Sequence, residues 1–200
     1  MVSKLKPKRK TKAGTNREKG IPRSQVLFAN GMRKLWIDHA IWTRNAIVSL
    51  VAGSPDTEPT VNRLLRNQDD IGNYFKPFYG NEIGNELAVL LREHITIAAQ
   101  LVEAAKAGNQ TDVQKYNQLW FANADKIVEL LSKINPKYST EELRSLFYKH
   151  LKQVTEIVMN RLSQNWEGEI KAFDAGENHI ILIADYLSAG IIKQFPQKFK

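Results

Sequence analysis

The chain contains no cysteine among its 200 residues. This absence excludes disulfide bonds, thiolate metal sites and cysteine nucleophiles, and it fits a reducing compartment. Any metal ion would therefore have to be held by histidine, carboxylate or amide groups.

Long apolar runs are also absent. A membrane-spanning helix needs about 18 consecutive apolar residues, and the best stretch, residues 40–52, is interrupted by Arg44 and Asn45. The N-terminus lacks the apolar region of a secretory signal. We therefore expect a soluble, intracellular protein without a transmembrane segment.

Common catalytic signatures are missing as well. The sequence has no Gly-rich phosphate loop, no Gly-x-Ser-x-Gly elbow and no Gly-x-Gly-x-x-Gly fingerprint. It also lacks the Glu-x-x-His pair of di-iron carboxylate bundles and the His-Glu-x-x-His motif of zinc proteases. The sequence therefore leaves open whether the protein is an enzyme and indicates no particular reaction.

Charge is distributed very unevenly. Residues 1–24 hold nine of the 29 basic side chains and one of the 21 acidic ones, so this segment alone carries the net charge of +8. The remainder is balanced, with 20 basic and 20 acidic side chains. Few bulky apolar residues interrupt the basic ones, which predicts a disordered arm over residues 1–24. The basic residues of the arm are Lys4, Lys6, Lys8, Arg9, Lys10, Lys12, Arg17, Lys19 and Arg23.

A basic arm of this kind attracts polyanions by releasing the counterions condensed on them. Nucleic acid is the partner that we predict. Anionic lipid, an acidic protein or a nuclear import receptor would bind the same basic side chains. Alternatively, the arm is a solubilising tail that has no partner.

Apolar residues after the arm recur at the three-to-four spacing of helices, without the alternation of strands. Short turns rich in Gly, Pro and Asn separate these stretches. The pattern predicts one all-α domain over residues 25–200, an antiparallel bundle of four long helices plus shorter ones. The predicted helices cover about 31–52, 60–75, 81–107, 111–133, 139–162 and 164–194, with a turn at 76–80.

An internal duplication is indicated by a shift of 56 positions. This shift superposes residues 67–71 on 123–127, matching Asn, Asp and Ile, and it superposes Leu90 and His94 on Leu146 and His150. A Pro-x-Tyr turn follows in both copies, at 77–79 and 136–138 with a local gap. We interpret these matches as a duplicated helix pair.

The four histidines fall one to a long helix. His39, His94 and His150 lie on apolar stripes, so their imidazoles are predicted to point inward, whereas the face of His179 is less decisive. A buried imidazole needs partners for its nitrogens. Those partners are either polar side chains, for which Asn123 and Asp125 with their duplicates Asn67 and Asp69 are the nearest candidates by type, or a metal ion.

Two interpretations of the histidines remain open. In the first, hydrogen bonds from imidazole to Asp or Asn fix the register of the helices and no ligand is involved. In the second, a divalent transition metal, either Zn, Fe, Cu or Ni, is held between the helices, because neutral imidazole suits these ions. The ligands of that metal would be His39, His94, His150 and Asp125, with His179 as a further candidate.

Several sequence blocks together carry a family resemblance. These blocks are 35–44 (LWIDHAIWTR), 77–80 (PFYG), 91–108, 120–125 and 194–196. Over residues 32–199 the chain resembles a family of small uncharacterised bacterial helical-bundle proteins, to which the basic arm is an addition. Members are sometimes labelled automatically as acetylglutamate kinase or glycosyltransferase. Those enzymes need nucleotide-binding α/β folds, so the resemblance implies a helical fold and neither activity.

The resemblance also implies a common polar centre, because His39, His94, Asp125 and His150 fit the family pattern. Our leading prediction is a binding or structural bundle with a buried histidine-centred core, whose arm attaches it to a polyanion such as nucleic acid. The alternative is a metalloprotein or metalloenzyme with a His/Asp site inside the bundle.

Overall fold

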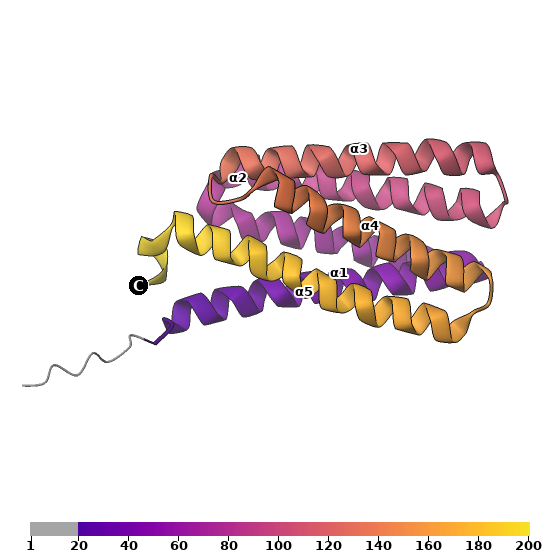
Figure 1. Ribbon diagram of the computed structural model, residues 1–200, viewed down its shortest axis with the longest axis horizontal. Coiled ribbons are helices and arrows are strands. Elements are labelled where there is room, and N and C mark those ends of the chain that lie inside the picture. The colour runs from indigo at the N-terminus through magenta and orange to yellow at the C-terminus, as the bar shows by residue number, and fades with distance from the viewer. Residues whose placement is uncertain (1–19) are drawn as a thin grey trace, which may run out of the picture.

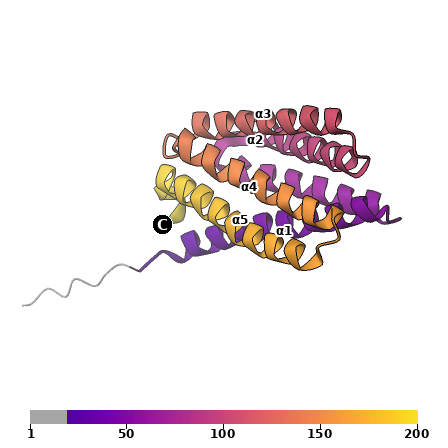
Figure 2. The same cartoon turned by 45° about the vertical axis from the view of Figure 1, so that its right-hand side comes forward.

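The computed structural model describes residues 20–200, and within this range every regular element is a helix. The predicted all-α class is therefore confirmed. Figure 1 shows the helices packed lengthwise, and the view in Figure 2 agrees. The elements are α1 (Arg23–Ala52), α2 (Thr57–Lys106), α3 (Gln110–Ile134), α4 (Thr140–Leu162), α5 (Trp166–Gln194) and a short 3₁₀ helix, η1 (Pro196–Phe199).

Helix α1 begins earlier than the predicted start near Gly31. It also begins inside the predicted arm, so Arg23 and Ser24 are helical rather than disordered. Tertiary contacts explain the difference, because Ser24 Oγ donates to the carbonyl of Phe199 at 2.8 Å and Phe28 packs on Tyr74. These contacts reach across the chain and leave no local signal in the first turns of the helix.

Helix α2 turns back on itself at Gly80, whose φ of 86° and ψ of 169° are not helical. Its two halves are antiparallel, since Arg92 donates to the carbonyl of Leu65 at 3.2 Å. At Gly72, an added Cβ would lie 2.4 Å from the carbonyl oxygen of Gly84, so the close approach of the halves requires glycine. The two helices predicted here are present, but residues 76–79 stay helical and the turn is confined to Gly80.

Polar contacts between other helices show the same alternation of direction. Along α1, Arg33 binds Asp185 at 2.5 Å, and Arg44 binds Glu169 at 2.6 Å. Residue numbers rise along α1 while those of its partners fall along α5, so these two helices are antiparallel. Short connections join the helices at both ends of the bundle, which makes lengthwise antiparallel packing the simplest arrangement.

The bundle consists of three equivalent helical hairpins: α1 with the first half of α2, the second half of α2 with α3, and α4 with α5. In each, a residue with positive φ lies one or two positions after the first helix: Gly53 (63°), Gly108 (70°) and Gln164 (59°). Single residues in this left-handed conformation commonly end helices. This recurrence fits the duplicated helix pair, which stays a prediction, and indicates a third copy.

The core is a continuous apolar cluster to which all five helices contribute. At the end of the bundle that holds Gly80 and η1, aromatic rings fill the space between α1, α2 and the C-terminal segment. We call this cluster the aromatic end; its rings are Phe28, Tyr74, Phe78, Phe195 and Phe199. Within residues 20–200, no helix is both long and apolar enough to cross a membrane.

Candidate histidine centre

One polar arrangement recurs in all three hairpins. The first helix of each hairpin carries one histidine, and a leucine lies four residues before it. The backbone carbonyl of this leucine accepts a hydrogen bond from a side chain of the second helix. The bonds are Asn67 Nδ2 to Leu35 O (3.0 Å), Asn123 Nδ2 to Leu90 O (3.1 Å) and His179 Nε2 to Leu146 O (2.8 Å). Each bond joins the two helices of its hairpin at one height and so fixes their register.

The histidines meet in the interior, as predicted for the three on apolar stripes. His39, His94 and His150 are 2%, 4% and 7% exposed, and His179 is 4% exposed. The rings of His39 and His150 lie 5.6 Å apart between centroids. We call these four residues the histidine centre.

His94 has the most completely defined surroundings. Its Nδ1 lies 2.8 Å from Asn123 Oδ1, while the amide nitrogen of Asn123 donates to Leu90 O and to Glu93 Oε2. Because that amide group faces two acceptors, Oδ1 must be the atom that faces His94, so Nδ1 carries the proton and Nε2 keeps a lone pair. On its other side the imidazole packs against the Trp120 indole, at 5.2 Å between centroids.

His39 occupies the equivalent position in the first hairpin but uses a different partner. Gln68 Nε2 lies 3.3 Å from His39 Nδ1 and donates to the carbonyl of Leu64 at 2.7 Å. The neighbouring Asn67 accepts from the same amide group at 3.1 Å. Asn67 thus takes the place of Asn123 at the leucine carbonyl, while Gln68 faces the imidazole.

The third hairpin departs from this pattern because His179 replaces the asparagine. His179 Nδ1 is buried and has no hydrogen-bond partner among residues 20–200. His150 lines a cavity of about 20 Å³ together with Gln153, Gly176 and Glu177, which is room for about one water molecule.

Burial keeps the imidazoles neutral. Desolvation lowers the pKa of His39 to about 4 and that of His94 to about 4, although the hydrogen bonds that pair His39 with Gln68 and His94 with Asn123 oppose the shift. For His150, burial and the charges of the other three histidines all lower the pKa well below its usual value. Four neutral rings at pH 7 can donate and accept hydrogen bonds, or offer lone pairs.

The candidate metal ligands are only partly brought together. The four histidines converge, but Asp125 lies outside the centre, where it binds Arg144 at 2.9 Å and accepts from the Tyr148 hydroxyl at 3.0 Å. Its duplicate Asp69 likewise binds an arginine, Arg92, at 2.9 Å. In the described part of the chain, no three His, Asp or Glu side chains are arranged to hold a metal ion.

The polyanion-binding prediction rests mainly on residues outside the described range. Only Arg23 lies within it, exposed at the start of α1, where the first turn carries no acidic residue. Outside the described residues lie Lys4, Lys6, Lys8, Arg9, Lys10, Lys12, Arg17 and Lys19.

Two features escaped the sequence prediction. Gln68 and the leucine carbonyls were not recognised as partners, although the spacing from histidine to amide is 28 residues for His39 and Asn67 and 29 for His94 and Asn123. Extending the alignment of His94 and His150 to His39, and that of Asn67 and Asn123 to His179, would have shown this repeat and its third copy.

Comparison of the chain with protein-family models, with curated proteins and with solved structures finds no match.

Proposed function

We propose that this protein is a binding protein whose helical body has a structural, histidine-centred core and whose basic N-terminal segment attaches it to a polyanion, namely nucleic acid. The observation that carries the proposal is the separation of charge. Residues 1–24 carry a formal charge of +8, whereas the remainder of the chain has equal numbers of basic and acidic side chains. Dense positive charge on a short segment is the usual electrostatic footprint of phosphate binding.

Pairing of charges in the body supports this division of roles. Arg33 binds Asp185, and Arg44 holds the buried Glu169 through two hydrogen bonds of 2.6 and 3.0 Å. Arginines engaged in this way compete poorly for phosphate, because a phosphate would have to displace a carboxylate. The N-terminal segment is therefore the stronger candidate for nucleic-acid contact.

The test compares the full chain with a chain that lacks residues 1–19, which leaves all of α1 intact. Binding to a 20-base-pair DNA duplex is measured by fluorescence anisotropy across a series of salt concentrations. The full chain should bind with a log–log salt slope of up to about −7, the value for eight phosphate contacts, and the shortened chain should lose this binding.

A matched control keeps the length of the segment. Replacing its eight basic residues at positions 4–19 by Gln should abolish binding as the deletion does. Retained DNA binding by either variant would contradict the proposal. Binding of the full chain to vesicles with anionic lipid, but not to DNA, would assign the segment to membranes instead.

A metal-binding role is the second candidate, favoured by the free lone pairs at the centre. The hydrogen bond from His94 Nδ1 to Asn123 leaves Nε2 available, and His179 donates through Nε2 while its Nδ1 has no partner in residues 20–200. An imidazole oriented by a hydrogen bond through its other nitrogen is typical of metal ligands. Such a site would need the rings to turn toward one ion.

Elemental analysis of the purified, tag-free protein distinguishes the two roles of the centre. About one equivalent of Zn, Fe, Cu or Ni, lost in His94→Ala and in His150→Ala, would support the metalloprotein. Metal-free, folded protein would leave the histidines as core architecture.

A further inference from the structure

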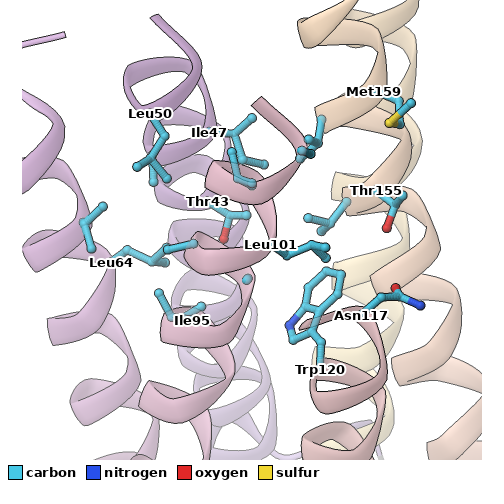
Figure 3. A pocket seen from close by; sticks show the side chains of 18 of the residues that line it. Thr43, Ile47, Leu50, Leu64, Ile95, Leu101, Asn117, Trp120, Thr155 and Met159 are labelled. Carbon is cyan, nitrogen blue, oxygen red and sulfur yellow. The ribbon is translucent and has the colours of Figure 1, made fainter. Parts of the chain in front are cut away.

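An apolar chamber of about 120 Å³ lies inside the bundle, between the histidine centre and the ends of the first helices at Gly53 and Gly108. Side chains of α1, both halves of α2, α3 and α4 form its walls (Figure 3). One helical turn beyond each histidine, the first helices contribute Thr43, Ala98 and Val154. The chamber therefore occupies the centre of the three-hairpin arrangement.

Small side chains keep this space open. The second hairpin places Ala98 where the first has Thr43, and Ala105 where the first has Leu50. Protein interiors are close-packed, so a void of this size lowers stability unless a ligand fills it. An engineered apolar cavity of about 150 Å³ takes up benzene, which sets the scale of molecule that fits.

The chamber wall contains a polar donor that has no partner. Trp120 is 2% exposed, and its indole Nε1 forms no hydrogen bond within residues 20–200. Figure 3 shows the indole beside Leu101, with the nitrogen edge on the side of Ile95. A buried donor without an acceptor is unfavourable, and such groups in native proteins call for an explanation.

Exposed residues line the chamber where α3 and α4 meet, and we infer that it opens to solvent there. Asn117 of α3 and Thr155 and Met159 of α4 line the chamber and are exposed on their outer sides. Met159 is 57% exposed despite being apolar. No charged side chain of residues 20–200 lines the chamber, so a neutral ligand suits it and an ion does not.

We propose that the chamber is a binding site for a small, neutral, apolar molecule of about the size of a six-membered ring that carries one hydrogen-bond acceptor, such as a carbonyl oxygen. The ring fills the apolar space, and the acceptor receives the Trp120 Nε1–H. This site is separate from the nucleic-acid segment, and the histidine centre forms its floor through the contact between Trp120 and His94.

Two probes of equal shape test the site in the full-length protein: cyclohexanone, which has a carbonyl acceptor, and methylenecyclohexane, which has none. Binding is followed in ¹⁵N–¹H spectra, where the Trp120 indole signal is identified by its loss in Trp120→Phe. Cyclohexanone should move that signal downfield, as a new hydrogen bond does. Trp120→Phe should reduce the preference for the ketone over the hydrocarbon by about fivefold, the factor for one net hydrogen bond.

Filling the chamber is the complementary test. Ala98→Leu should abolish binding of both probes and raise the Tm by about 2–4 °C, as cavity-filling changes do. Ala122→Leu, on the exposed face of α3, is the matched control and should leave both affinities unchanged. The proposal is overturned if neither probe binds the full chain, if folded Ala98→Leu still binds them, or if the indole that responds belongs to another tryptophan.

Discussion

The two ends of the bundle are built from the same three hairpins but are packed differently. At the aromatic end, Phe28 lies 5.0 Å from Phe78 and 5.1 Å from Phe199 between ring centroids, and the rings occupy the interior. Toward the other end, the space between the first helices of the hairpins is a chamber of about 120 Å³. The repeat thus sets the backbone, whereas the size of the side chains decides whether an end is filled.

The largest expected loss of stability comes from removing a buried ring near the aromatic end. Phe75 is 1% exposed, so Phe75→Ala should lower the free energy of unfolding by about 3–5 kcal/mol through lost burial and a new cavity. Leu101 is only partly buried beside the chamber, so Leu101→Ala should cost about 2 kcal/mol, the lower end of the range for this change. Urea unfolding of both variants gives the comparison, and equal losses would show that the two ends are packed alike.

The histidine centre lies between the two ends, and removing its amide side chains should lower the stability of the protein. Asn123→Ala removes the hydrogen bonds to His94, Leu90 and Glu93, and it should lower the free energy of unfolding by about 2–3 kcal/mol. Gln118→Ala, an exposed change on the same helix, should stay within about 0.5 kcal/mol of the parent. A small loss in Asn123→Ala would contradict the role of the amide in fixing register.

The pH dependence of stability tests whether the centre is neutral. The pKa of His39 and that of His94 are lowered from 6.5 to about 4, so below pH 6.5 the unfolded chain takes up protons that the folded chain does not. Stability is therefore fully present above pH 6.5 and falls as the pH is lowered, by about 1.4 kcal/mol per histidine per pH unit.

Urea unfolding at several values between pH 6.5 and pH 5 measures this slope. His94→Gln should reduce the slope by the contribution of one proton. A slope that is unchanged in this variant would mean that His94 is not held neutral.

The smallest change in the free energy of unfolding is expected from replacing a polar atom of the chamber wall. Thr43 Oγ1 is buried and has no hydrogen-bond partner in the described part of the chain. Thr43→Val replaces this hydroxyl by a methyl group of similar size and should raise the free energy of unfolding by about 1 kcal/mol. Thermal unfolding measures the change, and a loss of stability would indicate that the hydroxyl is satisfied.

Much of the fold was predictable because helical periodicity and turn residues are local signals. The hairpin of α2 and the inward direction of His39, His94 and His150 followed from spacing, whereas Asn123 was a candidate partner by residue type. The early start of α1 did not, because it depends on contacts with η1 that only the folded chain brings together.

The site was less predictable. The third hairpin was missed because His179 stands where the other copies have asparagine, and Asp125 matched by residue type although it faces solvent beside Arg144. The chamber left no pattern at all, since it arises from side-chain volume missing around Ala98 and Ala105. Periodicity shows which face is buried but not whether the buried face fills its space.

A crystal structure of the protein under xenon pressure tests the difference between the two ends most directly, because xenon enters dry apolar cavities. We expect xenon density among Ala98, Leu101 and Trp120 and none among the rings of the aromatic end. A chamber closed by these side chains and free of xenon would show that the two ends are packed alike.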